Sequence, residues 1–479
     1  MTGTTGAVVL GGGLAGLLAA TVLARHVDEV TVVDRDGLPA GPEPRKGVPQ
    51  GRHAHLLWSG GARTIEALLP GTTERWLAAG ARRVAVHQDM VSLTAYGWQH
   101  RFPGTQFMIA CSRPLLDHVV REAVLGHPRI TLRERTEARA LRGGADRVTG
   151  VTVLPLGAGR EEDLAADLVV DATGRGSRLD RWLPALGLPV PETDRVDPGI
   201  VYATRIYRAP HGMAADFPVV SVYADHRDGG PGRNGVVLPI EDDRWMVTLS
   251  GTRNGEPGGG EAEFLAFARA LRHPVVAELI AGAEPLTGVR RTRSTASRRL
   301  FCERAERWPA GLVVLGDALA ALNPVYGHGM SAAALGADAL DRALTEHALA
   351  PELAARAQQA IARVVDDPWI FAAAQDICYP DCRTDVRDPR LTTRAAERRR
   401  FAELIGATAI RSPSLSAATT AVSTLSVPSS SLEDPAVLAD LRRGPQRPEL
   451  LRPPLKAVER ELLARCAAAG EGVAGPGPG

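Results

Sequence analysis

The feature that most constrains the fold is a glycine-rich turn close to the N-terminus. A short apolar run, 7–10, leads into Gly11-Gly12-Gly13-Leu14-Ala15-Gly16, and the residues that follow, 17–25, have helical composition. A second run, 29–33, is rich in β-branched residues and ends at Asp34. This is the βαβ unit that binds dinucleotides: a strand, a G-x-G-x-x-G turn, a helix and a second strand that ends in an acidic residue.

Each position of this turn has a physical role. Gly11 permits the tight turn, Gly13 lets the backbone approach a pyrophosphate, and Gly16 lets the helix pack closely on the strand. The helix N-terminus attracts the pyrophosphate because its N–H groups are free and its dipole favours anions. Asp34 would accept hydrogen bonds from the ribose hydroxyls. The turn alone does not separate NAD from FAD.

A second motif makes that distinction. The buried-looking run 312–315 ends in Gly316-Asp317, and Asn323-Pro324-Val325-Tyr326-Gly327-His328-Gly329-Met330-Ser331 then opens an Ala-rich helix that we expect to end near His347. The pattern resembles the flavoprotein monooxygenase superfamily, in which Gly-Asp precedes Pro-x-x-Gly-x-Gly. The resemblance implies that Asp317 binds the ribityl chain of FAD. It also implies that the backbone of 327–330 lies beside the flavin ring, with the helix N-terminus stabilising negative charge on reduced flavin.

Further cofactor positions follow from the same resemblance. Arg113, at the start of an expected helix 113–125, matches the arginine that flanks the FAD phosphates, and Arg45 falls where an arginine or glutamine lies along the flavin. Thr173 departs from the pattern, since relatives carry an Asp there that is associated with FAD and the nicotinamide coenzyme. We therefore expect slow direct reduction by NAD(P)H and a separate flavin reductase as electron donor, with direct reduction left open. The expected cofactor-binding set is Gly11, Gly13, Leu14, Ala15, Gly16, Asp34, Arg35, Arg45, Arg113, Gly316, Asp317, Gly327, His328, Gly329 and Met330.

The order of patterns predicts an α/β fold: a Rossmann-like FAD-binding domain with a three-layer ββα core, an inserted antiparallel sheet and a helical C-terminal region. Between about 199 and 252 the apolar residues alternate with period two, which favours antiparallel strands. The expected FAD-binding domain comprises 1–80, 106–185 and 291–347. The substrate domain comprises a hairpin, 81–105, and a sheet, 186–290; a helical region, 348–466, and a disordered tail, 467–479, follow. Within the helical region, 412–431 is expected to be a linker or a surface loop.

A closer resemblance spans nearly the whole chain. Residues 45–55 (RKGVPQGRHAH), 96–102 (YGWQHRF) and 323–331 resemble the FAD-dependent epoxidases of polyether ionophore biosynthesis, of the monensin and lasalocid type. The resemblance implies that alkenes of a linear polyene polyketide, free or carrier-protein-bound, are epoxidised with O2 through a flavin C(4a)-hydroperoxide. Because an alkene is itself a nucleophile, such a site needs a dry, shaped pocket and no catalytic base.

The pocket is expected between the inserted sheet and residues 324–330. Its candidate lining residues are Tyr223, Val236, Leu238, Met246 and Pro324, and we expect only one of Val236 and Leu238 to face inward. The sequence assigns no catalytic residue; His328 is a candidate. His53 and His55 favour positioning or surface roles over metal ligation, because no further ligands are evident and no metal site is expected.

Composition excludes several classes of protein. The net charge of +1 excludes a strongly basic nucleic-acid binder. No apolar run reaches the roughly 20 residues of a membrane span, and no signal peptide is visible, so a cytoplasmic enzyme is expected. A flavin-dependent halogenase is disfavoured because it needs a lysine at the reaction site, and the only lysines are Lys46 and Lys456. An aromatic hydroxylase is the main alternative, and a non-enzymatic FAD-binding protein a remote one.

Overall fold

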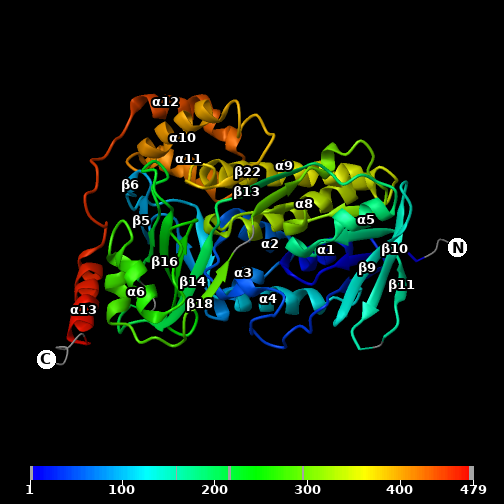
Figure 1. The fold of residues 1–479 in the computed structure, drawn as a ribbon, viewed down its shortest axis with the longest axis horizontal. Helices are drawn as coiled ribbons and strands as arrows, with labels where there is room; N and C mark the ends of the chain where they lie inside the picture. Colours follow the sequence, from blue (N-terminus) through cyan, green and yellow to red (C-terminus); the bar gives the residue numbers. More distant parts are fainter. Residues whose placement is uncertain (1–3, 158, 214–216, 294–295, 474–479) are drawn as a thin grey trace.

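The computed structural model describes residues 4–157, 159–213, 217–293 and 296–473 (Figure 1). Its centre is a five-stranded parallel sheet in the order β20-β12-β1-β2-β8. The expected βαβ unit is confirmed. The strands are β1 (Gly6–Leu10), β2 (Glu29–Val33), β8 (Ile130–Arg133), β12 (Leu168–Asp171) and β20 (Leu312–Val314), and helix α1 (Leu14–Leu23) connects β1 to β2.

Helices and a β-meander share one core with this sheet. The helices are α1, α2 (Ser59–Leu68), α3 (Thr72–Ala78), α4 (Arg113–Leu125), α5 (Leu179–Ala185), α8 (Gly329–His347) and α9 (Leu353–Asp376). The meander consists of β9 (Thr136–Gly143), β10 (Val148–Pro155) and β11 (Glu162–Ala165), and it packs against β12 and β2. Helices α4 and α8 confirm the predicted segments. Ser112 caps α4 by accepting a hydrogen bond from the N–H of Leu115.

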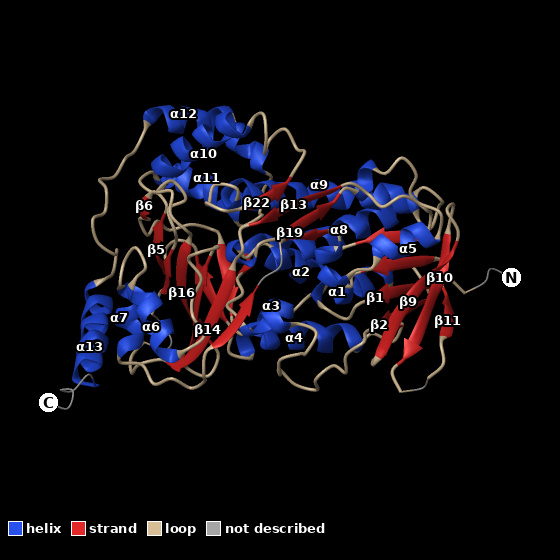
Figure 2. Cartoon of the chain, in the orientation of Figure 1, coloured by secondary structure: helices blue, strands red, loops and turns tan. Residues whose placement is uncertain are grey.

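The inserted sheet has seven strands in the order β18-β14-β17-β16-β15-β5-β6, seen on the left of Figure 2. They are β5 (Met90–Thr94), β6 (Gly97–Trp98), β14 (Val201–Arg208), β15 (Val219–Val222), β16 (Arg233–Ile240), β17 (Arg244–Gly251) and β18 (Arg290–Arg293). The β5–β6 hairpin joins the sheet as expected, but β5 runs parallel to β15, so the sheet is mixed rather than purely antiparallel.

The two faces of this sheet have different partners. Val237, Val247 and Leu249 pack against α6 (Glu261–Arg269), α7 (Val275–Ala281) and α13 (Ala457–Val473). The opposite face turns toward the flavin-binding half, where Leu238, Ile240 and Met246 pack with Val84 and Met108. The latter two belong to a small sheet of β3 (Leu57–Trp58), β7 (Phe107–Ala110) and β4 (Arg82–Ala85).

A four-stranded sheet joins the N-terminal half to the C-terminal region. Its order is β21-β19-β13-β22, with β13 (Thr193–Asp197), β19 (Ser297–Leu300), β21 (Ala320–Ala321) and β22 (Arg383–Asp385). Strand β13 therefore lies outside the inserted sheet, although the sequence reading grouped residues 186–290 together.

Three helices form what we call the C-terminal cap, residues 395–443. They are α10 (Ala395–Ala409), α11 (Pro413–Ser423) and α12 (Pro435–Arg443), at the top of Figure 1. The expectation of a linker or surface loop over 412–431 was wrong, because α11 fills most of it and buries Leu415, Ser416 and Thr420. Helix α13 extends to Val473, beyond the expected domain boundary at 466. The rest of the expected tail, 474–479, lies outside the described residues.

Candidate active site

The glycine turn has the geometry that a pyrophosphate requires. Gly11 has φ +100° and donates its N–H to the carbonyl of Val33 at 2.8 Å. A Cβ at Gly16 would lie 1.8 Å from the Gly11 carbonyl oxygen, so no larger residue fits there. A Cβ at Gly13 would meet nothing within 4 Å. The open side of Gly13, at the N-terminus of α1, is thus where an anion can approach the backbone.

Asp34 is fixed against this turn. One carboxylate oxygen accepts the N–H of Gly12 and a guanidinium N–H of Arg45, each at 2.7 Å, and the other accepts the N–H of Asp36 at 2.8 Å. Arg45 also donates to the Gly12 carbonyl at 2.7 Å. We expected Arg45 along the flavin ring, and the structure shows it bonded to Asp34 and to the backbone of the glycine turn. There it neutralises Asp34 and orients its carboxylate.

The loop that carries Arg45 closes over the start of α4. Arg45 and Arg113 line one recess together with Glu43, Val48, Asp117 and Arg121. Arg113 donates to Asp117 at 2.7 Å, one helical turn along α4. Arg45 is thus paired with Asp34 beside the glycine turn, and Arg113 with Asp117 in α4. Arg35 lines a separate recess with Lys46 and Arg135, on the outer side of β2.

Asp317 lies where three strand ends meet. It follows Gly316, whose φ is +65° and whose Cβ would lie 2.8 Å from the Cβ of Ala15 in α1. Burial raises the pKa of the Asp317 carboxyl, and 35% of its side chain is exposed. Arg175 approaches it to 3.6 Å, and Gly329 at the start of α8 faces its other oxygen. The exposed carboxylate can accept hydrogen bonds from a polyhydroxyl chain such as ribityl.

Thr173 is bonded to the preceding strand end. Its hydroxyl and N–H both donate to one oxygen of Asp171, at 2.5 and 3.0 Å, and Ser177 donates to the other at 2.6 Å. Asp171 is fully buried, and burial raises its pKa. Thr173 thus stabilises a buried acid, a role that the sequence reading missed because it compared only the superfamily position.

Residues 323–330, which we call the flavin loop, connect Asp317 to α8. Gly327 has φ +68°, and a Cβ there would lie 3.0 Å from the indole nitrogen of Trp58, which donates to the Tyr326 carbonyl at 3.0 Å. Met330 is buried in the main core. Residues 324–327 are partly exposed, Pro324 among them.

The C-terminal cap reaches the flavin loop directly. His328 is 2% exposed, and its Nε2–H donates to the carbonyl of Ser423 at the end of α11 at 2.9 Å. The N–H of Gly60 in α2 donates to Thr424 at 3.0 Å, and His87 is hydrogen-bonded to Thr420 at 2.9 Å. The sequence reading singled out His328 but had no signal for its partner 95 residues away.

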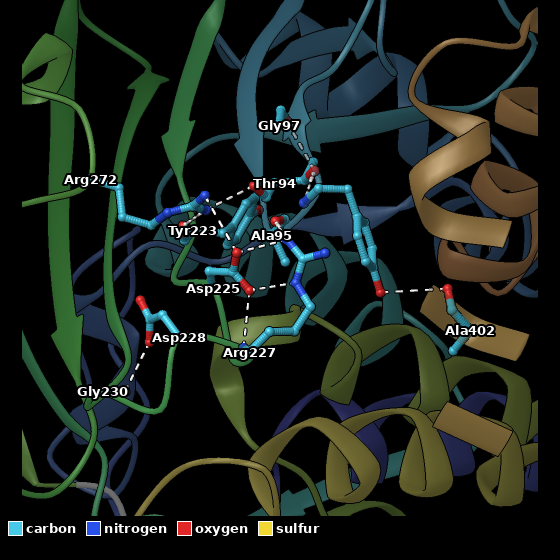
Figure 3. A network of polar contacts seen from close by, with 11 residues as sticks. Thr94, Ala95, Gly97, Tyr223, Asp225, Arg227, Asp228, Gly230, Arg272 and Ala402 are labelled. Atoms are coloured by element: carbon cyan, nitrogen blue, oxygen red, sulfur yellow. Dashed lines mark hydrogen bonds and ion pairs between the residues drawn. The ribbon is translucent and has the colours of Figure 1, made fainter. Parts of the chain in front are cut away.

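The other end of the cap is held by residues 96–102. The N–H of His100 donates to Ile410 at 3.2 Å, and Gln99 donates to Ser416 at 3.3 Å. The hydroxyl of Tyr96 reaches the Ala402 carbonyl of α10 (Figure 3). Tyr223 lies in this same network, where Arg272 donates to its carbonyl at 3.1 Å. Tyr223 therefore sits at the joint between sheet and cap.

Two histidines of the N-terminal half lie two residues apart: His53 is buried and His55 is partly buried. His53 is hydrogen-bonded to Thr204 of β14 at 2.8 Å, and His55 to the carbonyl of His53 at 2.9 Å. Burial lowers the pKa of His53 to about 4 and that of His55 to about 3. It also lowers the pKa of His328 to about 4. All three imidazoles are therefore neutral at pH 7.

The expectation that only one of Val236 and Leu238 faces inward was wrong. Residues two apart on a strand share a face, and both belong to the cluster turned toward the flavin-binding half, whereas Val237 points the other way. Leu238 is fully buried and Met246 is 2% exposed, so both are packed core residues. Val236 is partly exposed and stays a candidate lining residue.

A buried acid lies behind the flavin loop. Asp376, at the end of α9, accepts the hydroxyl of Tyr326 at 2.8 Å and the amide of Asn323 at 2.9 Å. The carbonyl oxygen of Asn323 in turn accepts the hydroxyl of Tyr202 from β14 at 2.9 Å. This chain joins the inserted sheet to the flavin loop. Sequence reasoning missed Asp376 because nothing around it forms a recognisable motif.

The model of a family described as FAD binding domain matches residues 4–350, which include both glycine motifs and Asp317. The chain belongs to this family of FAD-dependent monooxygenases. It binds FAD and uses O2 as co-substrate, as the members of this family do.

Relatives and solved structures agree with this assignment. The chain is 36% identical over 396 residues to Protein Rv3254 of Mycobacterium tuberculosis, covering 79% of this chain and 82% of that protein. It is 28% identical over 351 residues to kynurenine 3-monooxygenase of Salinispora arenicola, covering 71% and 72%. PqsL, a probable FAD-dependent monooxygenase from Pseudomonas aeruginosa, shares the fold with a TM-score of 0.58 and 19% identity, over 79% of this chain and 97% of that one. Among the described residues, no helix of this monooxygenase combines the length and apolarity that crossing a membrane requires.

Proposed function

We propose that this monooxygenase epoxidises alkenes of a linear, largely apolar polyketide in polyether biosynthesis. One atom of O2 bonds to both alkene carbons and the other leaves as water, while NAD(P)H supplies two electrons and a proton from solvent completes the balance. Bound FAD, once reduced, supplies the activation of O2. The resemblance of 45–55, 96–102 and 323–331 to polyether epoxidases motivates the choice of substrate.

The observation that carries the proposal is the uncharged centre of the face that the inserted sheet turns toward the flavin loop. The central residues on that face are Tyr202, Thr204, Ile206, Asn234, Val236, Leu238, Met246, Thr248 and Ser250, and the arginines on it, Arg208, Arg244 and Arg290, lie toward its edges. Tyr202 bonds directly to Asn323 of the flavin loop, which supports a place for this face beside the cofactor. A carboxylated aromatic substrate needs a cation for its charge, and none of the central positions offers one. An apolar alkene needs none.

The histidines beside this face also favour an alkene. Hydroxylation of a phenol is helped by removal of the phenolic proton, and a phenol has a pKa of about 10. Transferring that proton to a histidine whose pKa is about 4, such as His53, would be uphill by about 8 kcal/mol. Oxygen transfer to an alkene requires no such transfer. His53 instead bonds to Thr204 of β14, whose hydroxyl bonds to Thr248 of β17, and the N–H of Ala54 donates to Thr248.

Particular residues are assigned to FAD binding and to the exclusion of water. We propose that the backbone at Gly13 with Arg45 and Arg113 holds the pyrophosphate, Asp34 the ribose and Asp317 the ribityl chain. The cap, anchored on His328 through Ser423, covers the flavin loop and excludes water from the reacting atoms. Electrons come from a separate flavin reductase, because Thr173 is committed to Asp171.

Aromatic hydroxylation is the second candidate, and the kynurenine 3-monooxygenase relatives favour it. The discriminating experiment incubates purified holoenzyme, a flavin reductase and NADPH with a linear trisubstituted triene or with a panel of phenols and anilines. Mass spectrometry should show oxygen added to the triene and none added to the aromatic compounds. Hydroxylated aromatic products with an untouched triene would overturn the proposal.

A variant pair locates the pocket in the same assay. Val236→Asp places a charge on the sheet face toward the flavin loop and should abolish triene oxidation while FAD stays bound. Val236→Thr, a nearly isosteric change at the same partly exposed position, should retain it because it adds no charge. Full activity of Val236→Asp would show that the substrate lies elsewhere.

A further inference from the structure

Asp376 is a buried acid that has no charged partner in the part of the chain that the structure describes. It is 1% exposed, and among the described residues its carboxylate meets the neutral donors Asn323 and Tyr326. The other titratable groups that face it are Tyr202 from β14 and Cys378, Tyr379 and Cys382 from the segment after α9. Burial raises the pKa of each of these groups, so all are neutral at pH 7. Nothing in this shell compensates a negative charge on Asp376.

The carboxyl therefore changes its charge near neutrality. Burial raises the pKa of Asp376 to about 7, although the hydrogen bonds from Asn323 and Tyr326 oppose the shift. An ionised Asp376 accepts the Tyr326 hydroxyl, as the structure shows at 2.8 Å. A protonated Asp376 must donate its own proton. Because Asn323 presents its amide nitrogen to the acid, the oxygen of Tyr326 is the acceptor within reach.

That requirement reverses the Tyr326 hydroxyl. A hydroxyl has one proton to donate and lone pairs to accept. When Tyr326 accepts a proton from Asp376, its own proton is released to point away from the acid. Tyr326 is partly exposed and belongs to the flavin loop, whereas Asp376 is enclosed behind it. The released proton then points away from Asp376 and is free for another acceptor.

We propose that Asp376 is a positioning residue that sets the direction of the Tyr326 hydroxyl. As a carboxylate it draws the hydroxyl proton toward itself, and as a carboxylic acid it turns Tyr326 into a hydrogen-bond donor toward bound flavin or substrate. No covalent bond to carbon forms or breaks in this switch; one proton is taken up from solvent on Asp376 and one hydroxyl rotates. A donor in that place stabilises negative charge that develops on oxygen during transfer.

Infrared titration of the holoprotein, with label in the aspartate carboxyl groups, tests the switch without any substrate. We expect a protonated-carboxyl band that disappears with a midpoint near pH 7 in the wild type and is missing in Asp376→Asn. Tyr326→Phe removes one donor to the carboxylate, so the midpoint should rise by about one to two pH units. Tyr207→Phe, which removes a tyrosine hydroxyl on the opposite face of the inserted sheet, should leave the midpoint unchanged. A midpoint that Tyr326→Phe does not move would overturn the proposal.

The consequence for oxygen transfer rests on the proposed function and is measured separately. Asparagine presents a carbonyl to Asn323 and an N–H to Tyr326, so Asp376→Asn mimics the protonated acid. The ratio of triene product to released hydrogen peroxide should fall above pH 7 in the wild type and stay level in Asp376→Asn. A parallel fall in both enzymes would overturn the switch. A normal infrared titration with no triene product at any pH would instead overturn only the proposed epoxidation.

Discussion

The two ends of the cofactor site are built in different ways. At the nucleotide end, Gly11, Gly16 and Asp34 lie within one βαβ unit, and their contacts are mostly backbone contacts between near neighbours. At the flavin end, the loop 323–330 is held by Ser423, Asp376 and Tyr202, which come from three distant parts of the chain. The nucleotide end is thus set by local chain geometry, and the flavin end by the packing of the whole molecule.

The difference predicts which changes act locally and which act at a distance. The largest effect should come from Gly16→Ala, because its Cβ would lie 1.8 Å from the Gly11 carbonyl oxygen. We expect a loss of more than about 3 kcal/mol in the unfolding free energy of the FAD-free protein, measured by urea denaturation. Gly13→Ala is the matched control, since its Cβ meets nothing within 4 Å. It should keep the stability within about 1 kcal/mol yet weaken FAD binding. Equal losses in both variants would contradict the geometry of the turn.

The second largest effect should come from the ion pair that attaches α13 to residues 96–102. Arg101 pairs with Glu459 of α13 at 2.6 Å, and the side chains are only 11% and 6% exposed. Arg101→Ala leaves the Glu459 charge buried and unpaired, so we expect a loss of about 3 kcal/mol and faster proteolysis between α12 and α13. Arg142→Ala removes an exposed pair with Asp163 and should cost less than about 1 kcal/mol. Similar losses for the two arginines would argue against a tightly held C-terminal region.

Lowering the pH should destabilise the flavin end of the site before the nucleotide end. The pKa of His328 falls to about 4 in the folded protein, below its unfolded value of about 6.5. The stability contributed by its neutral form is complete above pH 6.5 and is lost as the pH falls toward 4, by up to about 3 kcal/mol. His328→Gln keeps a donor for Ser423 but cannot titrate. Its melting temperature should therefore fall less steeply between pH 6.5 and 4, and a slope identical to that of the wild type would refute this assignment.

The smallest effect concerns Asp317. Its carboxylate is 35% exposed and only 3.6 Å from Arg175, so Asp317→Ala should fold normally. Loss of a contact to the ribityl chain should weaken FAD binding by about 2 kcal/mol, roughly thirtyfold in Kd. Fluorescence titration of FAD-free protein measures it, and Asp317→Asn, which retains an acceptor oxygen, should lose less. Wild-type affinity in both variants would remove Asp317 from the site.

The same contrast explains what the sequence could predict. Local periodicity and glycine spacing predict the βαβ unit, helices α4 and α8 and the strand that leads to Asp317. The structure contains all of these elements. Asp376 and Ser423 were missed because their roles arise only when α9 and α11 fold back onto the flavin loop. The serine-rich composition of 412–431 pointed to a loop, but tertiary packing makes it helical. The motif indicated the neighbourhood of Arg45 but not its partner, Asp34.

The central claim is that this monooxygenase transfers oxygen from O2 to an alkene at the uncharged centre of the face that the inserted sheet turns toward the flavin loop. The most direct test is the isotopic composition of the product that purified holoenzyme forms from a linear triene under O2 enriched in heavy oxygen. We predict one heavy oxygen atom per epoxide and none derived from solvent water. A triene recovered unchanged while NADPH is consumed and peroxide accumulates, or a product whose oxygen comes from water, would contradict the claim.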